Sequence, residues 1–132
     1  MKYFTIAELC RSNTADRMGI NNRCRQQHVT ALTALVDNVL DPLRTWWGKP
    51  ITVNSGYRCP ELNAAVKGSK TSQHMSGEAA DIDTGDRQQN KLLFEYIRKN
   101  LPYDQLIDES NFAWVHVSYR ADGKNRNQVL SL

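Results

Sequence analysis

The stretch TSQHMSGEAADID, residues 71 to 83, carries the residue types that most plainly could do chemistry. It holds one histidine, His74, and two acids, Asp81 and Asp83, among residues that are mostly small or polar. Imidazole nitrogen and carboxylate oxygen are good zinc ligands, and a catalytic zinc takes three protein ligands and leaves a fourth position for water. His74 and Asp81 could supply two of the three if the chain folds back between them. The intervening glycine and two alanines would allow that close approach, because bulky side chains would crowd the metal.

The third ligand must come from elsewhere, and the chain has only two other histidines, His28 and His116. His28 falls on an expected helix, where an exposed or helix-packing role is favoured over metal binding. His116 lies in the middle of an expected strand, AWVHVSY, on the same face as Trp114 and Ser118. At this point His116 fits either a metal ligand or a buried, hydrogen-bonded structural histidine.

The first half of the chain predicts mainly helices. Thr5 and Glu8 have capping-box spacing and predict a helical turn after Thr5, whereas residues 14 to 24 are polar and are expected to form a surface loop. Apolar residues at three- and four-residue steps between 29 and 43 predict an amphipathic helix from about Arg25 to Trp47, which Pro42 would kink or divide. Residues 51 to 54 predict a strand, and Pro60 suits the first position of a short helix.

The second half predicts a sheet interrupted by one helix. Residues 78 to 83 predict a strand, and a helix is expected from about Asp86, with a buried side formed by Leu92, Leu93, Tyr96 and Ile97. Three further strands are expected in 103–109, 113–120 and 128–132. There is no internal repeat or linker, so the prediction is a single α+β domain over residues 1–132, with helices packed on a small antiparallel sheet.

Length and composition exclude several classes of protein. With 132 residues, 40% hydrophobic and 23% charged, the chain is long enough for a core and is unlike a disordered protein. No apolar run approaches the roughly 20 residues of a membrane helix, so no membrane insertion is expected. The net charge is +3, and the basic residues in 21–28 and 119–127 are neither dense nor interleaved with aromatics. No nucleic-acid partner is therefore expected, although mild attraction to an anionic polymer such as a cell wall fits.

The N-terminal stretch and the cysteines indicate where the chain is made. MKYFTIAELCRSN has one lysine, no long apolar region and no small-residue cleavage site, so no signal peptide is expected. Cys10, Cys24 and Cys59 are odd in number and contain no CxxC pair. We expect reduced thiols and synthesis in a reducing compartment.

Two blocks of the sequence together resemble the M15 family of zinc peptidases, the D-alanyl-D-alanine carboxypeptidases and related peptidoglycan peptidases. The matching elements are Ser55-Gly56-Tyr57-Arg58, Asn63, the run Ser72-x-His74-x-x-Gly77-x-Ala79-x-Asp81, and later Trp114-Val115-His116-Val117-Ser118. Their order and separation make the signal strong, unlike a lone pair of His and Asp. The short chain looks like the compact, phage-borne branch of the family.

The resemblance implies one Zn²⁺ held by His74, Asp81 and His116, and a fold shared with the Hedgehog signalling domain. It implies cleavage of peptide bonds next to D-amino acids in peptidoglycan stem peptides. Arg58 is carried over as the residue that binds substrate or steadies the oxyanion, for which a guanidinium is suited. Ser72 would hydrogen-bond the substrate backbone, or else cap its own turn.

The general base is the least defined part of the implied site. Zinc lowers the pKa of bound water from ~15.7 towards ~7, and a carboxylate is needed to take the proton and pass it to the leaving amine. Other branches of the family place that acid three residues before the last histidine, where this chain has Ala113. Glu109 and Asp108 are the nearest candidates, and Glu109 is preferred because similar compact members carry a glutamate after the DQLI strand. Asp83 is expected to be an ordinary strand-end acid, with orientation of a ligand histidine as the alternative.

Three functions remain open on the sequence alone. The preferred function is a zinc peptidase acting on peptidoglycan, either as a carboxypeptidase or as an endolysin endopeptidase. The absence of an acid at Ala113 leaves room for an inactive module that binds cell wall or serves in a phage particle. A purely structural zinc, with Cys59 as the nearest cysteine in sequence, is the weakest alternative. A monomer is expected, made in a bacterial cytoplasm from a phage or prophage and acting on the wall after release.

Overall fold

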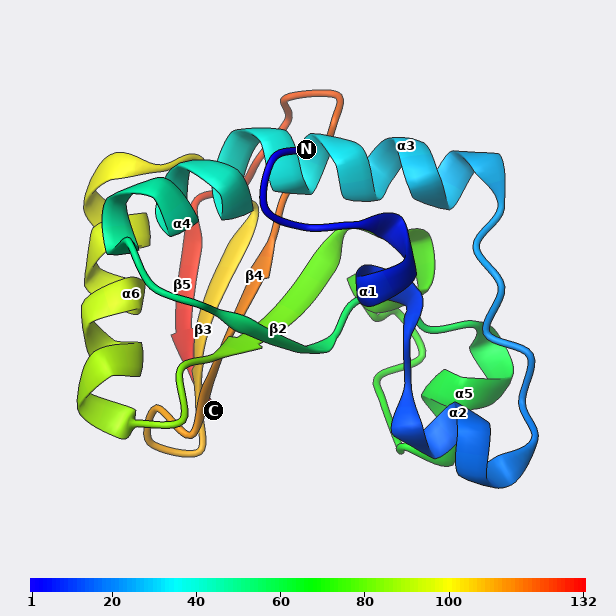
Figure 1. Cartoon of the computed structure of the whole chain (residues 1–132). Coiled ribbons are helices and arrows are strands. Elements are labelled where there is room, and N and C mark those ends of the chain that lie inside the picture. The colour runs from blue at the N-terminus through cyan, green and yellow to red at the C-terminus, as the bar shows by residue number, and fades with distance from the viewer.

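The computed structural model describes all 132 residues, and a five-stranded sheet lies at its centre (Figure 1). The strand order is β1–β2–β4–β3–β5. The strands are β1 (Thr52–Ser55), β2 (Ala79–Asp83), β3 (Gln105–Glu109), β4 (Trp114–Ser118) and β5 (Gln128–Ser131). The first four pair antiparallel, as predicted, but β5 runs parallel to β3 at the edge of the sheet. The sheet is therefore mixed rather than purely antiparallel.

Helices cover one side of the sheet and the region beside β1 (Figure 1). The α-helices are α1 (Ile6–Cys10), α2 (Asn13–Met18), α3 (Gln26–Leu35), α4 (Asp41–Trp47), α5 (Pro60–Ala65) and α6 (Arg87–Asn100). A π-helical turn, η1 (Val36–Leu40), joins α3 to α4, and a 3₁₀ turn, η2 (Gln73–Ser76), precedes β2. One hydrophobic core of 20 buried residues lies between the sheet and these helices, which confirms a single α+β domain. None of the helices combines the length and the apolar character needed to cross a membrane.

Side chains alternate along each strand, so one face of the sheet packs into the core and the other borders a cleft. Ala80, Ile82, Leu106, Val115 and Val117 belong to the face that is buried in the core. Their neighbours on the opposite face border a cleft and include Asp81, Ile107, Glu109, Trp114 and His116. The pairing of Asp81 with His116 and of Ile107 with His116 brings three strands together on that face.

The long helix is divided next to Pro42, as one of the two expectations had it, because the π turn η1 separates α3 from α4 and Pro42 lies in the first turn of α4. A proline has no N–H, so the carbonyl of Asn38 lacks its usual partner four residues later. The chain widens into the π turn just before this position, and the N–H of Asp41 donates to the carbonyl of Val36, five residues back. Single π turns of this kind occur as local interruptions inside α-helices.

Three expectations from the sequence are wrong, two about helices and one about the cysteines. Residues 13–18 form α2 rather than a loop, because the Ser12 hydroxyl accepts a hydrogen bond from the N–H of Ala15 and Gly19 ends the helix in a left-handed conformation. Leu92 lies on the outside of α6 with 54% of its surface exposed, and Asn90 is buried instead. The three cysteines are not all reduced, because Cys10 and Cys24 form a disulfide and only Cys59 is free.

A β-bulge interrupts the pairing of β1 with β2. Thr52 and Val53 pair with Asp83 and Ile82, and the next residue of β2, Asp81, pairs with Ser55. Asn54 is therefore the extra residue of the bulge, and it shifts Ser55 to the position opposite Asp81.

Candidate metal centre

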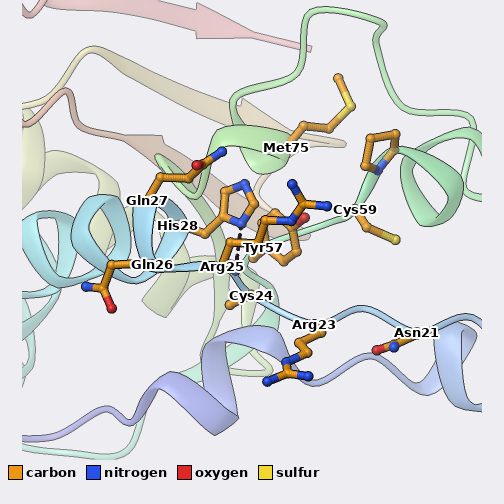
Figure 2. Close-up of a pocket in the computed structure, with 11 residues that line it drawn as sticks. Asn21, Arg23, Cys24, Arg25, Gln26, Gln27, His28, Tyr57, Cys59 and Met75 are labelled. Atoms are coloured by element: carbon orange, nitrogen blue, oxygen red, sulfur yellow. Dashed lines mark hydrogen bonds between the residues drawn. The ribbon is translucent and has the colours of Figure 1, made fainter.

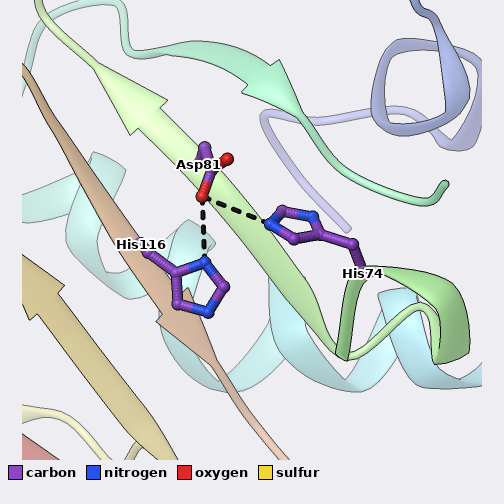
Figure 3. A group of neighbouring side chains, drawn as sticks. All are labelled: His74, Asp81 and His116. Carbon is purple, nitrogen blue, oxygen red and sulfur yellow. Dashed lines mark hydrogen bonds and ion pairs between the residues drawn. The ribbon is translucent and has the colours of Figure 1, made fainter. Parts of the chain in front are cut away.

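His74, Asp81 and His116 meet at the floor of the cleft. His74 comes from η2, Asp81 from β2 and His116 from β4, and one ligand atom of each lies within 4.8 Å of the other two. Figure 3 shows both imidazoles pointing at the same carboxylate from different sides. Residues separated by as many as 42 positions in sequence are thus brought together by the turn that precedes β2 and by the pairing of β2 with β4.

His74 is fixed in one tautomer by the chain itself. Its Nδ1 lies 2.7 Å from the carbonyl oxygen of Gly56, and a carbonyl can only accept, so Nδ1 carries the proton. Nε2 therefore presents a lone pair to the centre. It is buried without a hydrogen-bond partner and lies 3.3 Å from Oδ1 of Asp81. A backbone carbonyl that orients the other nitrogen in this way is typical of metal-binding histidines.

Asp81 is the hub of the group. Its Oδ1 lies 2.9 Å from Nδ1 of His116, and its Oδ2 lies 3.7 Å from NH2 of Arg58. Burial alone would raise the pKa of Asp81, but its hydrogen bond with His116 and its contact with His74 outweigh burial and hold the pKa well below its usual range. Asp81 is therefore ionised at neutral pH.

The donor set fits a cation. In the Nδ1–H tautomer of His74, the lone pair of Nε2 faces an ionised carboxylate oxygen at 3.3 Å. Two lone pairs at this distance repel unless a positive charge is shared between them. Two nitrogens and one carboxylate oxygen, with room left on the cleft side, match the three-ligand set of catalytic zinc sites.

Arg58 stands beside the centre in a fixed orientation. Its Nε donates to Oγ of Ser55 at 3.1 Å and its NH1 donates to Oδ1 of Asn63 at 3.1 Å. Burial lowers the pKa of Arg58, and the charge of Asp81 acts in the opposite direction. Arg58 also lines the cleft of about 540 Å³ above the three ligands, so its guanidinium is placed where a bound substrate would lie.

Ser72 acts first on its own turn. Its Oγ accepts a hydrogen bond from the N–H of His74 at 3.2 Å and caps η2. Of the two roles considered for Ser72, the structure displays the turn cap. Because Ser72 also borders the cleft, contact with substrate remains a prediction.

The two candidate bases lie on opposite faces of β3. Glu109 lines the cleft together with the three ligands, whereas Oδ1 of Asp108 accepts a hydrogen bond from the N–H of Phe112 in the loop that follows. Burial raises the pKa of Glu109, and the negative charge of Asp81 raises it further. Ala113 donates its N–H to the carbonyl of Glu109 and offers only a methyl group. Of the two candidate bases, Glu109 is therefore the one that lines the cleft.

Other residues considered from the sequence lie away from the centre. Asp83 accepts hydrogen bonds from Asn90 and Gly85, as expected of a strand-end acid, and orients no histidine. Cys59 is not part of the group that could bind a metal. His28 packs against Tyr57 with ring centroids 4.2 Å apart, in agreement with a packing role. The close approach at Gly77 serves this packing as well, since a Cβ there would lie 2.8 Å from the carbonyl oxygen of His28.

Asn22 is a supporting residue that sequence reasoning missed. Its Nδ2 donates to the carbonyls of Tyr57 and Cys10, both at 2.9 Å, and its Oδ1 accepts from the N–H of Cys59 at 2.7 Å. Asn22 thus holds the residues on both sides of Arg58. It lies 35 positions before Tyr57 in a stretch without periodicity, and no local pattern could have identified it.

The comparisons with known proteins agree with this geometry. The model of a family described as Peptidase M15 matches residues 2–118. The curated zinc D-Ala-D-Ala carboxypeptidase of Streptomyces albus G is 39% identical over 85 residues, which are 64% of this chain and 32% of the relative. The match therefore spans about a third of the length of that relative. The resemblance noted in the sequence is confirmed, and the chain belongs to the peptidase M15 family.

Proposed function

We propose that this protein is a zinc-dependent peptidase that hydrolyses peptide bonds in peptidoglycan stem peptides. One Zn²⁺ would be held by His74, Asp81 and His116. The observation that carries the proposal is the buried Nε2 of His74, which faces an ionised carboxylate and has no proton donor. The zinc D-Ala-D-Ala carboxypeptidase from Streptomyces supports the choice of metal and substrate.

The residues around the ligands divide the chemistry among them. Zinc, when bound, would act as a Lewis acid that lowers the pKa of water, so that hydroxide is available as the nucleophile at neutral pH. Glu109 takes the proton of the attacking water and delivers it to the nitrogen of the leaving amine, so that a single carboxylate serves as base and then as acid. The raised pKa of Glu109 brings it nearer to the value that both proton transfers require.

Arg58 supplies the positive charge that the reaction needs on the substrate side. Its guanidinium is already oriented by Ser55 and Asn63, so no rearrangement is needed when negative charge develops on the carbonyl oxygen. The same fork could instead bind a substrate carboxylate in a bidentate manner. Ser72, at the edge of the cleft, would hydrogen-bond the peptide backbone.

Digestion of purified muropeptides followed by mass spectrometry tests the proposal. The zinc-loaded protein should change the masses, a chelator should prevent the change, and added zinc should restore it. Loss of one terminal residue would indicate a carboxypeptidase, whereas separation of two stem peptides would indicate an endopeptidase. The variant His74→Ala should neither retain zinc nor cleave. If the wild-type protein holds zinc and binds sacculi but leaves every muropeptide intact, the protein is a binding module and not a peptidase.

We also propose that the protein acts on the wall as a monomer, after release from a cytoplasm in which a phage or prophage directs its synthesis. Sedimentation of the purified protein measures the first part. Cell lysis that requires a co-expressed membrane-permeabilising protein would support the second part, and lysis without one would contradict it.

A further inference from the structure

A second cavity, of about 770 Å³, lies on the other side of η2 from the metal centre. It is bordered by the segment before α3, the first residues of α3, the turn around Tyr57 and Cys59, and Met75 (Figure 2). Met75 borders this cavity, while the preceding residue, His74, belongs to the metal centre. None of the roles proposed above involves this cavity.

Two buried side chains offer hydrogen-bond donors to this cavity. The Tyr57 side chain is 5% exposed and that of His28 is 8% exposed, and the two rings stack with an interplanar angle of 28°. Nδ1 of His28 accepts a hydrogen bond from the backbone N–H of Arg25 at 3.0 Å. In the neutral ring the proton therefore lies on Nε2. Neither this N–H nor the hydroxyl of Tyr57 has an acceptor in the protein, and both residues line the cavity (Figure 2).

The charges around the cavity have one sign. Arg23 and Arg25 line it, neither forms a salt bridge, and no aspartate or glutamate is among the residues that border it. In Figure 2 the guanidinium of Arg25 lies close to the rings of His28 and Tyr57. Burial lowers the pKa of His28, and the charge of Arg25 lowers it further, so the imidazole stays neutral and acts as a donor at neutral pH. The N-terminus of α3 opens onto the same space and adds to the positive potential.

We infer that this cavity is an oxyanion-binding site. A phosphate or carboxylate group would accept from the Arg25 guanidinium, the Nε2–H of His28 and the hydroxyl of Tyr57, and Arg23 would add charge at the rim. Charge-assisted hydrogen bonds are the strongest of their kind, and the two neutral donors belong to residues that are themselves more than nine-tenths buried. A cation would meet two arginines, and an apolar ligand would leave these donors without acceptors.

The identification of the molecule that carries the oxyanion rests on the proposed function, a peptidase that acts on cell wall. Cell walls offer phosphodiesters in their anionic polymers and carboxylates in their stem peptides, and both groups have the required chemistry. Binding of either would hold the wall beside η2, close to the metal centre, and would raise the local concentration of stem peptides there.

Titration of the zinc-loaded protein with inorganic phosphate, and separately with acetate, tests the site directly. The imidazole ¹⁵N signals of His28 should shift and saturate, independently of any change in the signals of His74 and His116. The variant Arg25→Ala should weaken binding by about tenfold or more, and Tyr57→Phe, which keeps the ring and removes only the hydroxyl, by about threefold to tenfold. No hydrolysis is measured, so the result does not depend on peptidase activity.

Arg17→Ala is the matched control, because Arg17 lies exposed on α2, forms no salt bridge and carries the same charge. It should leave the affinity unchanged. An equal loss of affinity in Arg17→Ala and Arg25→Ala would show general charge attraction and would overturn the proposed site. The absence of a saturable shift with both ions would overturn it as well.

Co-sedimentation with cell walls then distinguishes the two sources. If phosphodiesters are the ligand, walls stripped of phosphate by hydrofluoric acid should bind the wild-type protein as weakly as intact walls bind Arg25→Ala. If stem-peptide carboxylates are the ligand, stripping should leave binding unchanged and Arg25→Ala should still weaken it. Equal binding of the wild-type protein and Arg25→Ala to both kinds of wall would overturn the inference for the wall.

Discussion

His74 shows how single residues define the centre. Its ring is held by the carbonyl of Gly56, and its backbone N–H is held by the hydroxyl of Ser72, so both the position and the tautomer are set before any metal binds. Preorganisation of this kind limits the entropy lost when the ligand set closes on an ion. The free energy of metal binding is therefore not spent on ordering this side chain.

Replacement of Glu109 by glutamine separates proton transfer from metal binding. Glutamine keeps the size of the side chain but cannot accept the proton of water, so kcat should fall by about 10²- to 10⁴-fold while the zinc content stays at one ion per chain. Steady-state kinetics on a stem peptide and elemental analysis measure the two quantities. Asp108→Asn is the control and should retain activity, because Oδ1 of an asparagine can still accept from Phe112. Full turnover in Glu109→Gln would exclude Glu109 as the base.

Asn22→Ala should impair catalysis through Arg58. Loss of its three hydrogen bonds frees the residues on both sides of Arg58, and a small displacement of a positioning group reduces kcat/KM by about tenfold or more. In an Arg58→Ala background the same change should have little further effect, because the residue that it positions is gone. Additive losses in the double variant would contradict this role. Asn100→Ala, at the exposed end of α6, is the matched control.

The residues of the candidate metal centre could be proposed from the sequence because the family pattern is restrictive, and the structure places His74, Asp81 and His116 together. A lone histidine and aspartate would not have sufficed, and it was the family pattern that selected His116 over His28. The supporting residues could not be predicted in the same way. Asn22 and Gly56 act through backbone groups that are distant in sequence, and an asparagine or a carbonyl carries no sequence signal for the partner that it meets.

At the scale of elements, the N-terminal segment forms a clamp on the turn that bears Arg58. The N–H of Tyr57 donates to the carbonyl of Leu9 at the end of α1, and a Cβ on Gly56 would lie 2.1 Å from that same oxygen. The disulfide between Cys10 and Cys24 ties α1 to the segment that carries Asn22. The clamp therefore joins three pieces of chain around one turn.

Removal of the disulfide should weaken this clamp. The bond spans a sequence separation of 14 residues, for which loop-closure entropy gives about 3 kcal/mol of stability. The double variant Cys10→Ser, Cys24→Ser should lower the free energy of unfolding in urea by about that amount, whereas Cys59→Ser should have a smaller effect. Thiol titration of the denatured protein should find one thiol without reductant and three with it. Three thiols in both cases would show that the bond is absent.

Most elements could be predicted from periodicity and end signals, and the failures have physical causes. The helix α6 begins where the periodicity indicated, with Asp86 as its N-cap. The helix α2 has only six residues, too few for a periodic signal, and depends on its Ser12 and Gly19 caps. Leu92 was misassigned because it lies next to Leu93 in a run of apolar residues. The disulfide depends on two cysteines that meet only in the folded chain, which spacing alone cannot reveal.

At the scale of the whole molecule, Asp104 joins η2, the turn that carries His74, to the far edge of the sheet. Its buried carboxylate accepts hydrogen bonds from the side chains of Arg126 and Gln73, and its backbone pairs with Ser118 and Gln128. η2, β4 and β5 thus share one anionic anchor. The path of the chain after β4 is fixed by this anchor more than by hydrophobic burial, since β5 is largely exposed.

Asp104 should make stability depend on pH. The hydrogen bonds from Arg126, followed by that from Gln73, hold its pKa below the usual value of about 3.9 despite burial. Its contribution is thus fully present above about pH 5 and is lost as the pH falls through the folded-state pKa. Asp104→Asn should reduce the free energy of unfolding by about 1–3 kcal/mol at pH 7, and the difference from wild type should shrink in acid.

Urea unfolding at several pH values measures this difference. Asp16→Asn, an exposed acid on α2, should show little change at any pH. A gap between Asp104→Asn and wild type that stays constant down to pH 2 would contradict the proposed linkage.

The β-bulge at Asn54 gives β1 one residue more than its partner strand needs. Ser55, which orients Arg58, reaches its place opposite Asp81 only through that surplus residue. Homologues that keep an arginine at the position of Arg58 should therefore show no gaps between β1 and this arginine. Insertions and deletions should instead accumulate in the exposed part of the connection between β4 and β5, residues 121 to 124, which lies before the Arg126 side chain that binds Asp104. A loop grafted into that connection is the modification that the protein should tolerate best.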